Sequence, residues 1–169
     1  MDETFIFHVT SCSDWKPSWA SWNNDWDGPV DFDCGKGYSI SRIRSYHDNC
    51  KEDRLWSFSC QSNAAAEHCS WSSHVNAYDE ALYYTCPHNG FITGVHSHHS
   101  NQREDRRFQF RCCHKHNYQR YDCRWTFRTY YDETIDYSTY HGYYLAGVRS
   151  YHNNYYEDRR WKFLSCRLI

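Results

Sequence analysis

The chain has 169 residues, of which 20 % are aromatic and 10 are cysteine, and its formal net charge is −2 at pH 7. This weak charge argues against binding to nucleic acid, and the lack of long apolar runs argues against insertion into a membrane. The length suits a single domain, 1–169, with a core of ordinary size. The even and high cysteine count favours a secreted, extracellular protein. Residues 1–4 do not begin a signal peptide, so in a secreted protein the signal would already have been removed.

The first 25 residues form an aromatic leader. Phe5-Ile6-Phe7 is followed by Trp15, Trp19 and Trp22, and no linker or low-complexity stretch separates this leader from the rest of the chain. We expect an N-terminal strand and then an irregular loop whose tryptophans are exposed and could stack on sugar rings.

One sequence motif, which we call the phrase, follows in three copies at offsets of 52 and 53 residues. Each copy runs from Ile or Val through Ser-x-His-x-Asn and Glu-Asp-Arg to aromatic-x-Phe, and the copies begin at Ile43, Val95 and Val148. Including the cysteine that opens each unit, the repeats cover about 12–61, 69–113 and 123–167. A repeat of this length predicts three copies of one structural unit.

Each unit reads as about four short β-strands. Val30-x-Phe32-x-Cys34 and Trp56-x-Phe58-x-Cys60 alternate with a period of two, and no window sustains a helical period. Arg42, Gly94 and Gly147 interrupt the alternation of one strand in each unit, which predicts a β-bulge there. We therefore expect an all-β, disulfide-rich domain with pseudo-three-fold symmetry, either β-trefoil-like or β-prism-like.

The alternation and the repeat together predict the disulfides. Cys34 and Cys60 point into the core of the first unit, and Cys86 and Cys112 take the same places in the second. In the third unit both places change together, to Thr139 and Ser165, as a bonded pair should. The predicted bridges are Cys12–Cys50, Cys34–Cys60, Cys69–Cys113, Cys86–Cys112 and Cys123–Cys166. The adjacent Cys112 and Cys113 could exchange partners.

The His-x-Asn…Glu-Asp-Arg turns should cluster at the end opposite the cysteines, beside the Trp-Asp or Tyr-Asp turns. An Asp that accepts backbone N–H groups and pairs with Arg is a common way to hold a hairpin turn, so we interpret the triplets as scaffolding first and ligand contacts second. Flanking residues that differ between units, such as Lys51, Arg103, Arg107 and Arg160, suit a ligand better. Among the repeated residues, the candidate ligand contacts are His47, His99, His152, Asn49, Asn101 and Asn154.

The 12 histidines raise the question of a metal or catalytic site. His96-x-His98-His99 and Cys112-Cys113-His114-x-His116 are candidates, but the second lacks the C-x-x-C spacing of structural zinc sites. No catalytic triad order, carboxylate pair or phosphate loop accompanies them. We expect no metal, no cofactor and no catalysis; a metal-dependent enzyme is the remote alternative.

The stretch 103–128 holds eight Lys or Arg against three acids, whereas 1–33 is acidic. Our candidates for an anionic-polysaccharide patch are Arg103, Arg107, Arg111, Lys115 and Arg120. Alternation places Arg107 and Arg111 on the face opposite Phe108 and Phe110, so binding should weaken with salt and strengthen below about pH 6.5, where histidines gain charge. The alternative is that these charges only solubilise the surface and pair with the acidic leader.

Asp53-Arg54-x-Trp56-x-Phe58 and its two later copies, with Cys112-Cys113 after the second copy, resemble the dermatopontin family, which includes the hemagglutinin/amebocyte aggregation factors. The resemblance covers the chain from about residue 20, with Phe108 in a place usually held by Trp and a Trp-rich leader in place of a Tyr-rich acidic tail. It implies a secreted, non-enzymatic adhesion or aggregation protein that binds cell-surface or matrix glycans, including glycosaminoglycans. The alternative is a matrix scaffold that binds collagen or proteoglycan proteins; association into homo-oligomers stays open.

Overall fold

The computed structural model of the protein describes residues 11–169, and all regular structure in this part of the chain is β. The strands are β1 (Val30–Asp33), β2 (Tyr38–Asp48), β3 (Asp53–Ser62), β4 (His68–Trp71), β5 (Leu82–Thr85), β6 (Phe91–Ser100), β7 (Asp105–His114), β8 (Arg120–Trp125), β9 (Ile135–Ser138), β10 (Tyr144–Asn153) and β11 (Asp158–Leu168). Residues 11–169 contain no helix that could cross a membrane. The strand expected in the leader, at Phe5-Ile6-Phe7, lies outside the described residues. Within 12–61 the structure has three strands, rather than the four expected of each unit.

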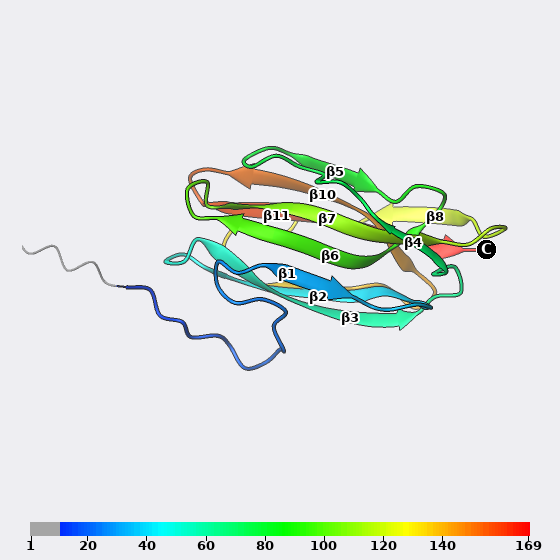
Figure 1. The fold of residues 1–169 in the computed structure, drawn as a ribbon, viewed down its shortest axis with the longest axis horizontal. Coiled ribbons are helices and arrows are strands. Elements are labelled where there is room, and N and C mark those ends of the chain that lie inside the picture. The colour runs from blue at the N-terminus through cyan, green and yellow to red at the C-terminus, as the bar shows by residue number, and fades with distance from the viewer. Residues whose placement is uncertain (1–10) are drawn as a thin grey trace, which may run out of the picture.

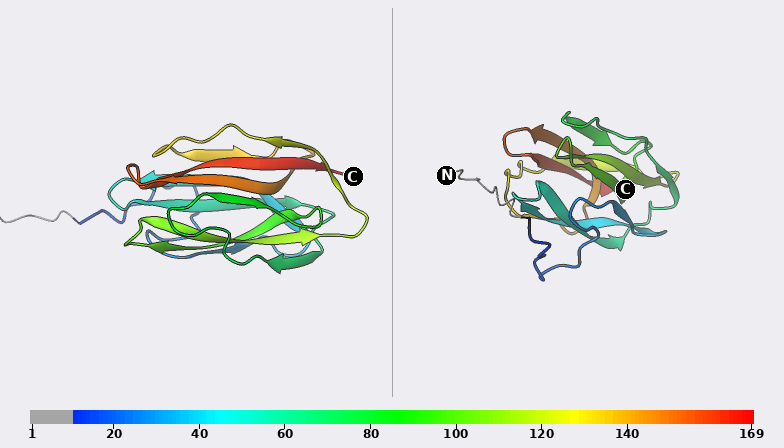
Figure 2. Two further views of the ribbon diagram at one scale, coloured as in Figure 1. Left: turned by 90° about the horizontal axis from the view of Figure 1, so that it is seen from above. Right: turned by 60° about the vertical axis from the view of Figure 1, so that its left-hand side comes forward.

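The strands form three antiparallel sheets, which we call face A (β1-β6-β7-β4), face B (β3-β2-β9) and face C (β5-β10-β11-β8). Each face is built on the long hairpin of one unit. Its edge strand comes from the preceding unit in cyclic order: β1 pairs with β6, β5 with β10, and β9 with β2. The three sheets surround a shared core (Figures 1 and 2). Because every unit lends a strand to the next, the faces cannot separate without breaking backbone pairing.

The centre of the core is aromatic. Trp56, Phe108 and Trp161 take equivalent places and meet at ring-centre distances of 5.0–6.2 Å. A second layer stacks an aromatic of each edge strand on an aromatic of its own unit that lies in the neighbouring face, as Phe32 of β1 does on Phe58 of β3 at 5.1 Å. Aromatic pairs at such distances add to the stabilisation that burial of their surface gives.

The predicted bulges are confirmed. The register of each long hairpin shifts just before Arg42, Gly94 and Gly147. At Gly94 and Gly147 an added Cβ would lie 2.8 Å from the carbonyl oxygen of Phe32 or Tyr84 on the edge strand. Glycine is needed at these two places because the crossing strand comes so close.

The five predicted disulfides are all present, and no cysteine of the described chain is free. Cys34–Cys60 joins the end of β1 on face A to β3 on face B, and Cys86–Cys112 joins the end of β5 on face C to β7 on face A. The third junction, between β9 and β11, has none. One expectation needs correction: Cys50 lies in the β2–β3 turn, where it ties down the leader through Cys12, and not at the end where the other cysteines gather.

Candidate functional site

The Glu-Asp-Arg turns meet at one end of the molecule and form a closed ring of ion pairs. Each Arg holds the Asp of the preceding unit in cyclic order through two hydrogen bonds of 2.7 Å: Arg106 to Asp53, Arg159 to Asp105, and Arg54 to Asp158. The six side chains are only 2–5 % exposed. Burial alone would raise the pKa of the Asp158 carboxyl, but the Arg54 guanidinium outweighs burial and holds that pKa below its ordinary value. The Asp and Arg of the Glu-Asp-Arg triplets thus serve as scaffolding, but each Arg joins two neighbouring units instead of closing its own turn.

The ring also fixes the turns around it. The backbone N–H groups of Asp27, Asp79 and Asp132 each donate to the ring Asp of the hairpin that follows in the same unit, at 2.8–2.9 Å. Each Arg donates to a carbonyl oxygen of the same turns, as Arg106 does to Gly28 at 2.8 Å. Every charged group of the ring is therefore paired, which is the condition for burying charge without a large loss of stability, although the Nη1 atoms of Arg106 and Arg159 have no hydrogen-bond partner within the described chain.

The repeated histidines support this ring from outside. The side chains of His47, His99 and His152 are 1 % exposed, and their Nδ1 atoms lie 3.2–3.4 Å from an Asp carboxylate of the neighbouring turn. With the ring Asp they form three His-Asp-Asp groups whose oxygen and nitrogen atoms lie within 4.8 Å of one another. Arginine already occupies both oxygens of each ring Asp, so these carboxylates are not free to bind a metal ion. Asn49, Asn101 and Asn154 lie exposed at the turn tips.

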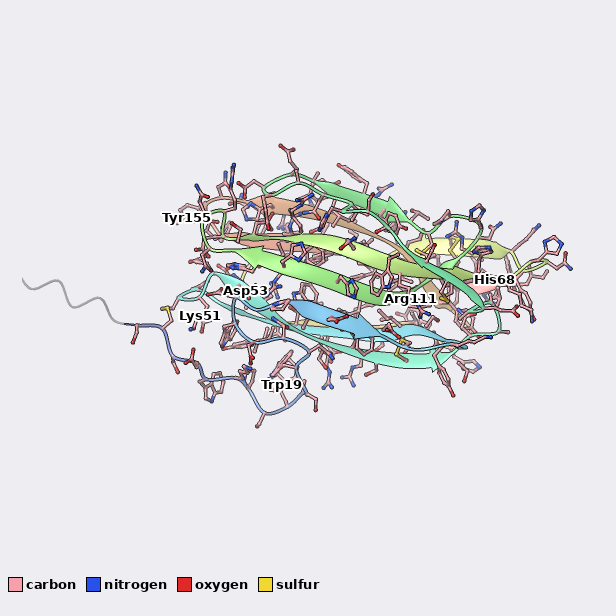
Figure 3. The ribbon with its side chains drawn as sticks, in the orientation of Figure 1. Trp19, Lys51, Asp53, His68, Arg111 and Tyr155 are labelled. Carbon is pink, nitrogen blue, oxygen red and sulfur yellow. A yellow bond between two sulfur atoms is a disulfide. The ribbon has the colours of Figure 1, made fainter. Side chains whose placement is uncertain are left out.

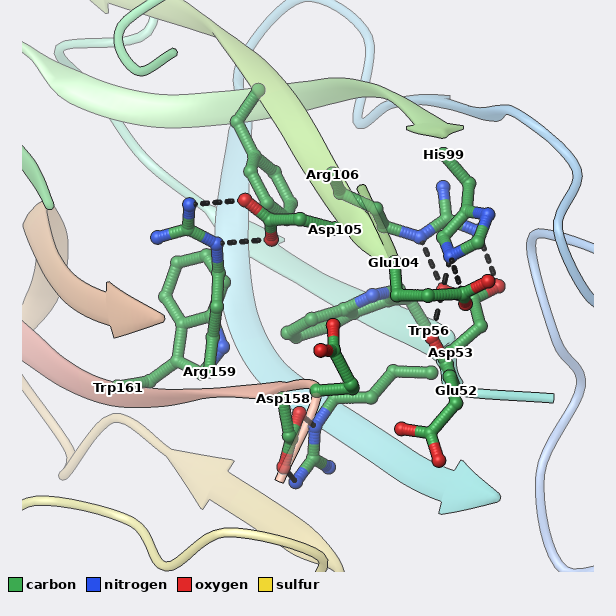
Figure 4. Close-up of a pocket in the computed structure, with 13 residues that line it drawn as sticks. Glu52, Asp53, Trp56, His99, Glu104, Asp105, Arg106, Asp158, Arg159 and Trp161 are labelled. Carbon is green, nitrogen blue, oxygen red and sulfur yellow. Dashed lines mark hydrogen bonds and ion pairs between the residues drawn. The ribbon is translucent and has the colours of Figure 1, made fainter. Parts of the chain in front are cut away.

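Three glutamates surround the opening of the ring (Figure 4). Glu52, Glu104 and Glu157 occupy the left-handed region with φ of 48–50°, and with Trp56 and Trp161 they line a cavity of about 30 Å³, the size of one water molecule. Burial, and then repulsion from Glu157 and Glu104, raises the pKa of Glu52 to about 7. Burial likewise raises the pKa of Glu104 and Glu157. The cavity is too small for a sugar ring.

The structure spreads the five residues of the predicted basic patch along β7 and beyond it. Arg103 precedes β7 and Lys115 follows it, so a ten-residue strand of roughly 33 Å separates them. Arg103, Arg111 and Lys115 each lie 3.6–3.8 Å from a carboxylate, of Asp79, Asp33 and Glu67 respectively.

The other two residues of the predicted basic patch, Arg107 and Arg120, also have partners within the chain. Arg107 donates to the carbonyl oxygen of Asn76 and lies over the ring of Tyr78 at 5.8 Å. Arg120 is half-buried, donates to the carbonyl oxygens of Cys86 and Gly90, and has a pKa lowered by burial. Only Arg107 and Arg111 share a surface, the outer side of face A.

A tryptophan beside a basic side chain recurs on the outer side of all three faces. Trp19, Trp71 and Trp125 are related by offsets of 52 and 54 residues. Arg44 lies 5.7 Å from the Trp19 ring, His96 stacks on Trp71 at 3.6 Å, and Arg149 lies 4.4 Å from the Trp125 ring. Trp19 is 45 % exposed, and Figure 3 shows it standing away from the strands; Trp71 and Trp125 are half-buried. An apolar ring next to a hydrogen-bond donor is the pairing that suits a sugar, whose C–H face stacks while its hydroxyls accept hydrogen bonds.

The three faces differ in the residue of the edge strand that pairs with the strand position of the basic residue. On face A, Asp31 lies 2.7 Å from His96, and on face B, Asp136 is the strand partner of Arg44 and binds Arg42 with two hydrogen bonds. On face C the equivalent residue is Tyr83, which is 59 % exposed.

Around Trp125, face C therefore carries cations without ion-pair partners, whereas Asp122 on β8 pairs with Arg124 and Arg167. Arg149 and Lys162 lie directly opposite each other on β10 and β11, and neither belongs to any ion pair of residues 11–169. Arg160, two residues before Lys162, packs over Tyr131 at 4.7 Å. Like charges opposite each other cost stability, and the Trp125 and Tyr83 rings beside Arg149 offset part of that cost.

Comparison with known proteins identifies the family of this chain. The family model for dermatopontin matches residues 24–169. The chain belongs to the dermatopontin family. A hemagglutinin/amebocyte aggregation factor of Limulus polyphemus is 41 % identical over 153 residues, 88 % of each chain. Millepora cytotoxin-1 of Millepora dichotoma is 41 % identical over 144 residues, 85 % of this chain and 65 % of that protein. Dermatopontin of Biomphalaria glabrata is 36 % identical over 140 residues, 82 % of this chain and 95 % of that protein. No solved structure matches.

In this member of the dermatopontin family, the repeated Asp-Arg-x-aromatic-x-Phe phrase is structural. Its Asp and Arg form the ring, and its aromatics fill the core. The residues that sequence reasoning missed are not among the repeated residues of the phrase: Trp71, Trp125, Arg149 and Lys162, the last of which fills a variable position within it. The 52- and 54-residue spacing of the tryptophans was the signal that could have revealed them.

Proposed function

We propose that this protein is an extracellular, non-enzymatic adhesion or aggregation protein that binds carbohydrate on the outer sides of its three faces. The repeated tryptophan–basic pair is the observation that carries the proposal, because it sets an apolar ring and a donor side by side on each face. Five disulfides suit an oxidising extracellular setting, and the Limulus relative is named for agglutination and aggregation.

Three similar faces on one rigid body also supply valency. Agglutination requires that one molecule hold at least two cells or chains at once, and linked weak sites gain strength through effective concentration. Sites on three faces around a common core point in different directions (Figure 2). A single copy of this chain can thus cross-link without forming an oligomer.

Face C is the best site for a sulfated or carboxylated sugar. Arg149 and Lys162 offer two unpaired cations next to Trp125, with Tyr83 alongside. An anionic sugar would relieve the repulsion between the cations and stack on the aromatic rings. On face A, Asp31 lies against His96, and on face B, Asp136 is bound to Arg42 and lies opposite Arg44, so we assign neutral sugars to those two faces.

Retention on immobilised heparin and dermatan sulfate tests the proposal, alongside a glycan array. The double variant Arg149→Glu/Lys162→Glu should elute at much lower salt than the parent. The double variant Arg107→Glu/Arg111→Glu tests the alternative surface on face A, and Lys36→Glu is the control for charge reversal at one exposed residue. Equal elution of the parent and the face C variant would refute face C as the anionic site, and no binding to any glycan would refute the proposal.

The pH dependence separates the two surfaces further. Face C relies on Arg and Lys, which stay charged between pH 5.5 and 8, whereas face A carries His96, His74 and His98 near Arg107. Retention through face C should not change over this range. Burial, and then the nearby Arg107 and His98, lowers the pKa of His74, so retention that rises as the pH falls would point to face A.

A further inference from the structure

The first unit lacks the strand that borders the long hairpin in the other two units. On face A, β4 pairs with β7, and on face C, β8 pairs with β11. Face B ends at β3, and residues 11–29 of the chain form no strand beside it. Figure 1 shows the last part of β3 at the border of the molecule, beyond the leader. The outer edge of β3 is therefore open where the edges of β7 and β11 are covered.

The sequence explains why the leader does not fill this place. In the second unit the disulfide Cys69–Cys113 holds β4 to β7. An offset of 52 residues places Pro17 and Gln61 at these two positions in the first unit. Proline has no N–H to donate to a neighbouring strand, and glutamine cannot form a disulfide. The leader is bridged instead to the β2–β3 turn, at the other end of the hairpin.

Two residues at the end of β3 have backbone groups on the open side. Residues of an antiparallel strand direct their N–H and C=O groups alternately to the two neighbouring strands. The N–H of Asn23 donates to the carbonyl oxygen of Trp56 at 2.7 Å, so Trp56 and every second residue after it face the open side. Cys60 and Ser62 are the last two of these residues, and both are exposed. Within the described chain their outward groups have no hydrogen-bond partner, whereas the equivalent residues of β7 pair with β4.

This part of the edge has none of the features that keep sheet edges apart. Proteins protect such edges with charged side chains, prolines or bulges. The segment Ser59-Cys60-Gln61-Ser62 has no charge and no proline, and the bulge of this hairpin lies in β2 and not in β3. By contrast, β1 at the edge of face A carries Asp31 and Asp33, so its pairing with a second copy would bring like charges together. The open end of β3 can pair with itself without such repulsion.

We propose that two copies of this chain associate through this edge, with β3 of one copy antiparallel to β3 of the other. Antiparallel pairing of identical strands has two-fold symmetry, so each copy supplies the backbone groups that the other lacks. With Cys60 opposite Ser62 of the second copy, the two B faces become one continuous sheet. The disulfide Cys34–Cys60 already fixes the edge in the single copy, which lowers the entropy lost on association.

A second copy fits this edge better than a foreign peptide does. Peptides that add to a sheet edge are selected by pockets for their alternate side chains. The side chains of Ser59 and Ser62 are short, Cys60 is in a disulfide, and Gln61 is held by hydrogen bonds to Thr139 and the carbonyl oxygen of Tyr143. These side chains do little to distinguish one peptide from another. The edge therefore selects a partner by backbone geometry and lack of charge, which a second copy matches.

Sedimentation velocity of the full chain between about 1 μM and about 1 mM tests the proposal, because so short an edge makes a small and weak interface. We expect a monomer at the lowest concentration and a dimer at the highest. Amide hydrogen exchange at Cys60 and Ser62 should slow as the dimer forms, since these N–H groups have no partner in the monomer. A monomer at every concentration would overturn the proposal. So would slow exchange at every concentration, because a segment of the same chain would then cover the edge.

Substitutions at one residue locate the interface. Ser62→Pro removes an outward N–H without altering the pairing of β2 with β3, and Ser62→Lys sets like charges against each other; each should weaken association at least about tenfold. An equal mixture of Ser62→Lys and Ser62→Glu should associate again, because opposite charges then meet. Ser70→Lys makes the same change on β4, at the edge of face A, and should associate like the parent.

A dimer that persists in Ser62→Pro and Ser62→Lys, or that Ser70→Lys weakens equally, would overturn the proposal. The association does not depend on carbohydrate binding, which retention on heparin measures separately. Failure of the dimer would thus leave the proposed function standing, and failure of glycan binding would leave the dimer standing.

Discussion

The inner ring and the outer faces both follow the three-fold repeat, but only the ring keeps the same residues in all three units. In the ring, all three units keep the same Asp, Arg and His, and the bond lengths agree to within 0.1 Å where Arg meets Asp. On the outer faces only the tryptophan persists, while its partners change from Arg44 to His96 to Arg149. Positions that close the fold cannot vary independently because each touches another unit. Positions on the outside can, and there the units acquire different binding properties.

Breaking the ring should have the largest effect. Arg106→Ala leaves Asp53 buried without its partner, and such a loss costs about 3–5 kcal/mol of unfolding free energy. Its neighbour Arg107 lies on the outside of the same strand, so Arg107→Ala should cost less than about 1 kcal/mol. Urea unfolding of the two variants makes the comparison, and equal losses would mean that the ring is no more important to stability than the surface.

The next effect comes from the disulfides that join the faces. The variant Cys34→Thr/Cys60→Ser copies the residues of the third unit into the first and should cost about 2–4 kcal/mol. Hydrogen exchange should then quicken at the junction of faces A and B, to the level of the junction between β9 and β11, which has no bridge in the native chain. Unchanged exchange at that junction would show that backbone pairing alone holds the faces together.

A smaller effect concerns the glutamates at the ring. The folded pKa of Glu52, about 7, lies above its ordinary value of 4.5, so the folded state favours the protonated carboxyl. This group therefore lowers stability progressively as pH rises from about 4.5 to about 7, and the full loss is present above that. Glu52→Gln should raise the unfolding free energy by about 1 kcal/mol at pH 8, given that solvent screens a partly exposed carboxylate, and should change it little at pH 4. Thermal unfolding at both pH values checks the sign; a variant less stable than the parent at pH 8 would contradict it.

The sequence predicted those parts of the fold that depend on period. Alternation along Val30-x-Phe32-x-Cys34 predicted strands, and the paired change to Thr139 and Ser165 predicted which cysteines join. The exchange of edge strands and the Arg106–Asp53 pairing between units could not be predicted in this way. In a repeat, a contact within one unit and the same contact to the next unit leave identical patterns in the sequence.

The candidate site was harder to predict than the fold. The charge count over 103–128 treated residues close in sequence as close in space, but an extended strand carries Arg103 and Lys115 to opposite ends. Arg149 and Lys162 are distant in sequence and become neighbours only through the register of β10 and β11. Their lack of acidic partners is a property of the assembled face and is invisible in any one segment.

Ligand should bind on the outer sides of the faces and not at the ring, and the indole N–H signals of the tryptophans distinguish these two places. Trp125 lies on face C, whereas Trp56 and Trp161 line the cavity at the ring, and their indole N–H groups have no hydrogen-bond partner within the described chain. A short sulfated oligosaccharide added to ¹⁵N-labelled protein should shift the Trp125 indole signal in a saturable way and leave those of Trp56 and Trp161 in place. Shifts of Trp56 and Trp161 with an unmoved Trp125 signal would mean that the ring is the binding site and that the account is wrong.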